Sequence, residues 1–204
     1  MALRDKIADD IYAGTNSKGI IGLNTAVDSS DTYGGISVAD FSGWAAGEDN
    51  TAHTEANMKD STSTSYVLTL LQNAFRSCTH YGEKPNLVVT TLKVWDIIES
   101  VLHRDTNYNK DTSNKRTKLI GELGYNTIEF RGVPIIADEK CPDGYMYVLN
   151  TNYMKFYVHP SRNFYFTGWK KPTNQDARVA QILLAAQLTL NNRRMHYKFT
   201  ALPS

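Results

Sequence analysis

The spacing of apolar residues predicts three helices in the first half of the chain. Leu3, Ile7 and Ile11 recur every four residues, which predicts a short helix over residues 3–12 that ends at Gly14. The other two predicted helices cover residues 63–80 and 92–103. Their apolar residues each form one stripe: Tyr66, Val67, Leu70, Leu71, Ala74, Phe75 and Cys78 in the first, and Val94, Trp95, Ile98, Val101 and Leu102 in the second.

Short β-rich runs prevail in the second half. A buried strand is expected over residues 86–90, between the two longer helices, and further strands follow at 127–130, 133–137, 145–149, 155–158 and 163–167. A turn is expected at Pro142-Asp143-Gly144, just before the strand at 145–149, because Pro presets φ and Gly accepts a positive φ. The polar turn at 159–162 predicts that the strands on either side of it pair.

The last two apolar segments, residues 177–190 and 195–201, flank a polar turn at 191–194. The first segment is rich in Ala, Gln and Leu, which also favour a helix. The second alternates apolar and polar residues, which favours a strand, so a long closing hairpin is predicted. With helices early and strands late, the fold class is α+β.

Two stretches show no regular period. Residues 15–60 are rich in Gly, Ser, Thr and Asp with short apolar beads, which predicts a long ordered loop region with one or two short strands. Residues 104–118 are almost wholly polar and predict a solvated loop.

Composition and charge argue against some classes of function. The chain has 204 residues, of which 41% are hydrophobic, enough for a sizeable core. With 22 basic and 21 acidic residues the net charge is +1, so no global field draws the protein to nucleic acid or to an anionic membrane. Neither a transmembrane run nor a signal peptide is recognisable, and synthesis in the cytoplasm is expected. The twelve tyrosines suit surfaces that meet other chains.

The two cysteines, Cys78 and Cys141, are too few for a disulfide framework or a zinc site. A thiol and an imidazole stand close together in Cys78-Thr79-His80, but positions i and i+2 of a helix point about 200° apart. Cys78 also completes the apolar stripe of its helix. Both cysteines are therefore interpreted as structural thiols, with no catalytic residue predicted.

Other candidate sites are equally weak. The acidic pairs Asp138-Glu139 and Asp9-Asp10 lie at element edges, where charged residues are usually solvated. The segment 14–19 lacks the Gly-Lys-Ser/Thr ending of a phosphate loop. The histidines have no metal-ligand spacing: His53, His80, His103, His159 and His196. No metal and no cofactor are predicted.

The order of these segments resembles the C-terminal two-thirds of a tailed-phage major capsid protein of the Hong Kong 97 type. Gly19-Ile20-Ile21-Gly22-Leu23 resembles the loop that follows the family's spine helix, and Tyr33-Gly34-Gly35-Ile36 a loop of one branch. Pro85 to Thr90 between two helices resembles the core of the axial domain. Phe130 to Ile135, followed by Asp138 and Cys141 to Gly144, resembles a strand pair of the family, and Gln187 to Leu202 its closing hairpin.

This resemblance implies a fold and a function. Residues 1–17 would end the spine helix, 18–152 would form the axial domain with a central sheet flanked by helices, and 153–204 would supply peripheral-domain strands. The chain would be a structural subunit of a bacteriophage head, assembling as pentamers and hexamers into an icosahedral shell around DNA. Because the family carries an arm, a loop and most of the spine helix before the corresponding point, a truncated form is expected.

The implied partners are copies of the chain itself, with portal, scaffold or decoration proteins as further candidates and DNA only indirectly. The implied location is the virion. Expected subunit contacts lie in the polar loop and at the closing turn: Arg104, Tyr108, Lys110, Asp111, Lys115, Arg116, Gln187, Arg193 and Arg194. Three alternatives stay open: an encapsulin-like shell protein, a small thiol hydrolase, and a nucleic-acid- or sugar-binding module.

Overall fold

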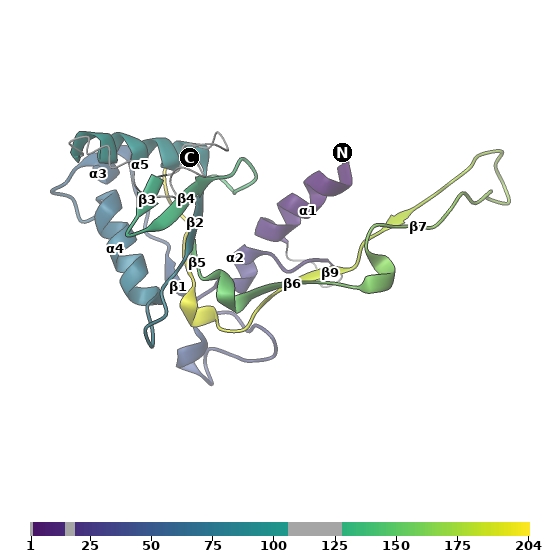
Figure 1. Ribbon diagram of the computed structural model, residues 1–204, viewed down its shortest axis with the longest axis horizontal. Helices are drawn as coiled ribbons and strands as arrows, with labels where there is room; N and C mark the ends of the chain where they lie inside the picture. Colours follow the sequence, from purple (N-terminus) through teal and green to yellow (C-terminus); the bar gives the residue numbers. More distant parts are fainter. Residues whose placement is uncertain (1, 15–18, 106–127) are drawn as a thin grey trace.

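The computed structural model describes residues 2–14, 19–105 and 128–204. Figure 1 shows a body that contains the main sheet and most helices, and a long two-stranded arm that leads away from it. The six-stranded sheet has the order β1-β10-β5-β2-β4-β3, with β1 parallel to β10 and β2 parallel to β4. Its strands are β1 (Gly47–Asp49), β2 (Leu87–Thr90), β3 (Ile128–Phe130), β4 (Val133–Ala137), β5 (Met146–Leu149) and β10 (Tyr197–Phe199).

Two longer helices cover one face of this sheet. Helix α4 (Val67–Cys78) and helix α5 (Leu92–Asp105) share a core cluster with alternate residues of the strands, such as Val88, Met146 and Val148. The apolar stripes predicted these helices correctly, although α4 begins later than expected. The short helix α3 (Glu55–Lys59) lies against α5 and is capped by Thr54, which accepts a hydrogen bond from the Asn57 amide.

The opposite face of the sheet packs in a second cluster. Since side chains alternate across a strand, Val89, Tyr147 and Leu149 point to this face while their neighbours point to the first. Helices α1 (Ala2–Ala13) and α2 (Leu23–Ala26) supply Tyr12 and Leu23 to it. Strand β5 is therefore buried on both faces, which explains its continuous apolar sequence.

The backbone packs closely where the chain leaves α1. The amide of Gly22 donates to the carbonyl of Gly14 at 2.7 Å, and a Cβ on Gly22 would lie 2.6 Å from the Tyr12 carbonyl oxygen. Only glycine fits at this contact. The expected loop region of residues 15–60 thus contains α2, the single-turn 3-10 helix η1 (Ser42–Trp44), β1 and α3 within its described part.

The arm consists of two short ladders in series. Strand β6 (Met154–Val158) pairs with β9 (Ala186–Leu190), and β7 (Tyr165–Phe166) pairs with β8 (Ile182–Leu183), both antiparallel. The 3-10 turn η3 (Pro160–Arg162) lies between β6 and β7. The arm ends beyond a bridge between Lys170 and Val179.

Two predicted pairings are wrong. The strands on either side of residues 159–162 do not pair with each other, because each pairs with the returning chain of the arm. The closing hairpin of residues 177–190 and 195–201 does not form either. Strand β9 pairs with β6 in the arm, whereas β10 lies between β1 and β5 in the main sheet. The short 3-10 helix η4 (Arg193–Met195) carries the chain from arm to sheet.

Candidate functional site

Neither cysteine lies where a nucleophile would need to be. Cys78 is fully buried in the core cluster of α4, as expected for a core cysteine, and Cys141 is 5% exposed in the second cluster. Burial raises the pKa of each thiol to about 12, with Asp138 and Asp143 adding to the effect at Cys141. His80 follows the end of α4 and bridges to Glu83 through its backbone.

These thiols are expected to react slowly in the folded protein. With a pKa near 12 and little access to reagent, each should be modified on the order of a thousandfold more slowly in native buffer than in urea at pH 8. Release of the aromatic thiol from a disulfide reagent, followed by absorbance, measures both rates on one sample. A thiol that reacts equally fast in the native and the unfolded protein would contradict this and revive the thiol-hydrolase alternative.

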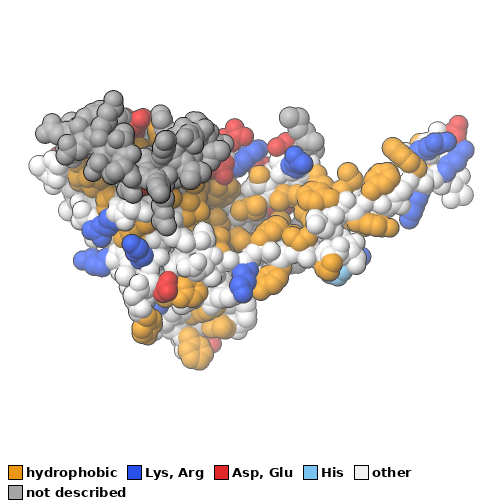
Figure 2. All heavy atoms as spheres, in the orientation of Figure 1, with side chains coloured by type: hydrophobic (Ala, Val, Ile, Leu, Met, Phe, Trp, Pro, Cys, Tyr) orange, Lys and Arg blue, Asp and Glu red, His pale blue; other side chains and the backbone are white. Residues whose placement is uncertain are grey.

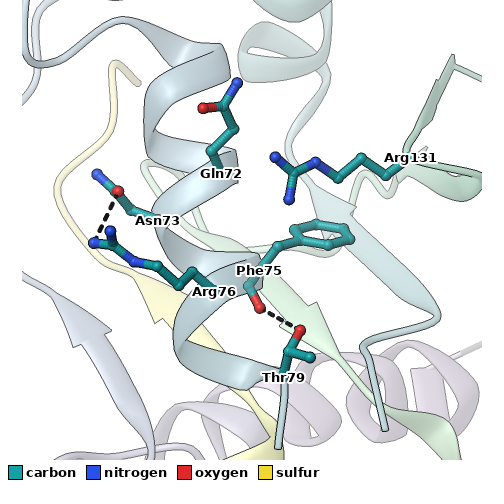
Figure 3. Close-up of a pocket in the computed structure, with 6 residues that line it drawn as sticks. All are labelled: Gln72, Asn73, Phe75, Arg76, Thr79 and Arg131. Atoms are coloured by element: carbon teal, nitrogen blue, oxygen red, sulfur yellow. Dashed lines mark hydrogen bonds between the residues drawn. The ribbon is translucent and has the colours of Figure 1, made fainter. Parts of the chain in front are cut away.

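An open pocket lies on the outer side of α4, with a volume of about 480 Å³ (Figure 3). Its lining residues are Gln72, Asn73, Phe75, Arg76, Thr79 and Arg131. The Thr79 hydroxyl donates to the Phe75 carbonyl at 2.6 Å and has no base beside it, and the Arg131 guanidinium lies over the Phe130 ring at 5.4 Å. The described residues that line the pocket thus offer cations and amides, but no carboxylate, imidazole or thiol for acid–base or nucleophilic chemistry.

The histidines and acidic pairs do not combine into a metal site in the part of the chain that the structure describes, where no group of three potential ligands occurs. Asp138 instead accepts a hydrogen bond from the Tyr12 hydroxyl at 2.5 Å, and Asp9 lies 3.4 Å from Lys140. Within the described residues, no helix is both long and apolar enough to cross a membrane.

A buried guanidinium holds the loop after α2. The side chain of Arg193, which is 0% exposed, donates to the carbonyl oxygens of Ala26, Asp28 and Asp31 at 2.7–2.8 Å. It also lies 5.5 Å from the centre of the Tyr33 ring. The expectation that Arg193 is a surface contact is therefore wrong, because its donors are consumed inside the subunit.

A buried ammonium group lies in the same region. Lys198 on β10 is 3% exposed and contacts Asp28 at 2.8 Å, Glu48 at 3.0 Å and the Asn24 carbonyl at 3.0 Å. Burial raises the pKa of Asp28, but the hydrogen bonds from Lys198 and from two backbone amides lower it by more than burial raises it. The net pKa of Asp28 therefore lies well below its usual range. The loop after α2 and strand β1 are thus fixed to β10 by charge.

Sequence reasoning missed both of these roles. The alternating pattern of residues 195–201 predicted a strand but no role for Lys198, and the polar turn led to the expectation that Arg193 is a subunit contact. One signal was available: residues 19–58 contain six acidic residues and no Lys or Arg, so buried carboxylates there need cations from elsewhere.

The arm carries the largest set of exposed apolar side chains among the described residues. On β6, Phe156 and Tyr157 are 45% and 56% exposed, and farther along the arm the exposed residues are Phe164, Tyr165, Phe166, Trp169, Val179 and Ile182. Figure 2 shows these apolar side chains running along the arm, with basic side chains gathered at its tip. The arm is anchored at its root, where Leu188 and Leu190 are buried and the Leu190 amide donates to the Tyr33 hydroxyl at 3.1 Å.

The predicted contact residues are scattered. Tyr108, Lys110, Asp111, Lys115 and Arg116 lie outside the described residues, and Arg104 is in the last turn of α5. Gln187 is half-buried on β9, where its amide oxygen accepts from the Ile21 amide at 3.3 Å. Arg194 is exposed on η4, next to the buried Arg193.

The comparison with known families decides the identity. The model of the SU10 major capsid protein family matches residues 14–203. The chain belongs to this family. Among curated protein sequences, none is significantly similar to the chain.

Solved structures agree on the fold of this family member. The capsid asymmetric unit of cyanophage A-1(L) has a TM-score of 0.59 at 20% identity, over 99% of this chain and 66% of that one. The holo-SrpI encapsulin complex of Synechococcus elongatus PCC 7942 also has a TM-score of 0.59, at 12% identity, over 99% of this chain and 62% of that one. Both are of the Hong Kong 97 type, so the mixed helix and sheet fold predicted by resemblance is confirmed.

The chain spans just under two thirds of the length of each of these two proteins. The family match supports the phage capsid reading over the encapsulin alternative, because the encapsulin likeness extends to the fold alone.

Proposed function

We propose that this chain is a structural subunit of a bacteriophage head, and that its copies associate as pentamers and hexamers into a closed icosahedral shell around DNA. The single observation that carries the proposal, beside the family, is the arm. A structural subunit needs surfaces that are left uncovered in the isolated chain and become covered in the assembly.

The arm is such a surface. A two-stranded ribbon has no core of its own and is marginally stable in water. Here both ladders carry aromatic residues that are about half exposed, including Tyr165 at 55% and Phe166 at 49%. Large exposed apolar patches mark interaction sites in soluble proteins. Repetition of many modest contacts of this kind around a closed shell yields a stable particle.

The proposed division into domains follows the body and the arm. Residues 18–152 would form the axial domain near the capsomer centre, joined by β10 in the same sheet, with the end of the spine helix at residues 1–17 and the arm as the peripheral part. Arg104, Tyr108, Lys110, Asp111, Lys115 and Arg116 are proposed as contacts around the capsomer centre. Gln187 and Arg194 are proposed as contacts toward neighbouring capsomers.

The proposed location is the virion, after synthesis in the cytoplasm of the host. Portal, scaffold or decoration proteins are proposed as further partners, with DNA enclosed by the shell and contacted only indirectly. These assignments rest on the capsid family to which the chain belongs.

Removal of arm aromatics is expected to abolish particle formation. The double variant Phe166→Ser/Trp169→Ser removes two rings whose centres lie 6.0 Å apart on the arm. If neighbouring copies cover these rings, association should weaken on the order of a hundredfold or more, because buried aromatic residues dominate interface energies. Light scattering and electron microscopy of purified full chains measure the change.

The matched control is Tyr81→Asn. Tyr81 is 95% exposed at a positive φ of 53° in the turn before β2, a conformation that Asn tolerates. Its replacement should leave particles unchanged. Thermal melts should be the same for all three proteins, since every replaced side chain is exposed. Equal assembly by the arm variant and the wild type would contradict the proposal.

A further inference from the structure

The arm and the body differ in charge. Residues 154–190 contain five Lys or Arg and one acidic residue, Asp176, although the whole chain is almost neutral. At the tip, Lys171 pairs with Asp176 at 2.7 Å, which leaves Lys170 and Arg178 as exposed cations without an acidic residue of the arm to balance them. The tip therefore combines exposed apolar side chains with a net positive charge.

A loop on the body has the opposite character. In residues 31–41, Asp31 and Asp40 are exposed and there is no Lys or Arg. In the same segment, Ile36 is 39% and Phe41 is 67% exposed. We call this segment the acidic loop. Buried Arg193 holds the start of this loop by donating to the Asp31 carbonyl at 2.7 Å.

The arm of one chain does not cover its own acidic loop. Figure 1 shows the arm projecting away from the body to one side, whereas the loop around η1 lies at the bottom of the body, far from the tip of the arm. Among the described residues, no hydrogen bond or ion pair joins the tip to the loop. The complementary charges and apolar side chains can therefore meet only between two molecules.

We propose that the tip of the arm, residues 169–179, docks on the acidic loop of a second copy of this chain. Trp169 would cover Ile36 and Phe41, while Lys170 and Arg178 approach Asp31 and Asp40. Apolar contact would supply the affinity, and the opposite charges would select the partner surface and speed association. This inference rests on the proposed function, since it names the surface that the arm occupies in the assembly.

Disulfide trapping between two copies tests the contact directly. One full chain carries Thr173→Cys at the exposed tip and the other carries Ala39→Cys in the acidic loop. The two native thiols are buried and stay out of the reaction. After mixing and oxidation, the mixed disulfide dimer should form about tenfold faster than with the control Ser77→Cys, an equally small exposed residue on α4.

Charge reversal adds a second readout. Asp31→Lys/Asp40→Lys in the loop partner, or Lys170→Glu/Lys171→Glu/Arg178→Glu in the arm partner, should each reduce trapping to the control rate. The two reversed partners together should restore it. Trapping at the control rate, or trapping that ignores both reversals, would overturn the inference.

The outcomes separate this inference from the proposed function. Closed particles in the electron microscope without trapping would leave the capsid role standing and refute the docking site. Trapping without closed particles would support the docking site and count against the shell. If the tip instead binds a DNA duplex in a salt-dependent way and no trapping occurs, its charge serves nucleic acid and the inference is wrong.

Discussion

Replacement of Arg193 by methionine is expected to destabilise the folded chain by about 3–5 kcal/mol. Methionine keeps the aliphatic volume and removes the guanidinium, so the carbonyls of Ala26, Asp28 and Asp31 lose a charged donor each. Because the side chain is 0% exposed, water cannot replace these donors without opening the structure. Urea unfolding, followed by circular dichroism with linear extrapolation, measures the loss.

The chain supplies its own control at the next position. Arg194 has the same charge and length but is exposed on η4, so Arg194→Met should leave the urea midpoint unchanged. A pair of variants with equal midpoints would show that the buried guanidinium contributes nothing to stability. The Arg193 variant should also loosen the segment after α2 and the start of the acidic loop, which hydrogen exchange at the amides of residues 28–33 would detect.

Helices of this chain were predictable because their information is local. The stripe from Val67 to Cys78 fits one face of a helix, and its burial in the core follows from that spacing alone. The turn before β5 was readable for the same reason: the Tyr145 amide donates to the Pro142 carbonyl, and Gly144 has a φ of 79°. In each case the deciding residues lie within a few positions of one another.

Strand pairing could not be predicted in this way. Strand β10 lies next to β1 and β5, and β9 next to β6, so partners are distant in sequence while nearer candidates are passed over. Periodicity shows that a segment is a strand but not which edge it joins. The predicted hairpin of residues 177–190 and 195–201 is wrong because the two segments were paired only on the ground that they are neighbours in the sequence.

The candidate surfaces were predictable only in part. Abundant tyrosine indicated contact surfaces, and Tyr157 and Tyr165 on the arm are indeed exposed, but Tyr33 and Tyr147 are buried with the same side chain. The exposure of a tyrosine on a strand depends on whether a second layer of the fold covers that strand. The residues of the arm alone do not indicate whether such a layer is present. The role of Lys198 could not be predicted, because a buried cation is recognised only when the carboxylates that contact it are known, and these lie far away in the sequence.

Strand β10 thereby contributes an electrostatic anchor as well as a place in the sheet. Its ammonium group lies between Asp28, from the loop after α2, and Glu48 on β1. Three segments far apart in sequence thus meet at one charge. Breaking a buried ion pair on one side leaves the other charge without compensation, which costs more than the pair itself contributes.

Replacement of Lys198 by methionine is therefore expected to destabilise the chain by about 3–5 kcal/mol at pH 7. The variant would bury two carboxylates beside one another without their ammonium partner, while the nearby Arg193 guanidinium stays bonded to backbone carbonyls. Urea unfolding at pH 7 measures the loss. As a matched control, Lys59→Met removes a cation that pairs with Glu55 at 2.6 Å on the surface of α3, and its urea midpoint should stay close to that of the wild type.

The pH dependence gives this prediction a sign. In the wild type, burial raises the pKa of Asp28, but the bonds from Lys198 and from the amides of Ser30 and Asp31 outweigh it and bring the pKa below the unfolded value of 3.8. The stabilisation by Asp28 is therefore complete above about pH 4 and is lost as the pH falls further. Without Lys198, burial and the neighbouring carboxylate are expected to raise the pKa of Asp28 above the unfolded value.

For the Lys198→Met variant the penalty should then shrink on acidification, because one of the two carboxylates takes up a proton as the pH falls through its raised pKa. The difference in unfolding free energy between wild type and variant is expected to be largest at pH 7 and clearly smaller at pH 4.5. Adding Glu48→Gln to the variant removes one of the two charges and should recover much of the loss at pH 7. A difference that stays constant from pH 7 to pH 4.5 would show that lost packing, and not uncompensated charge, destabilises the variant.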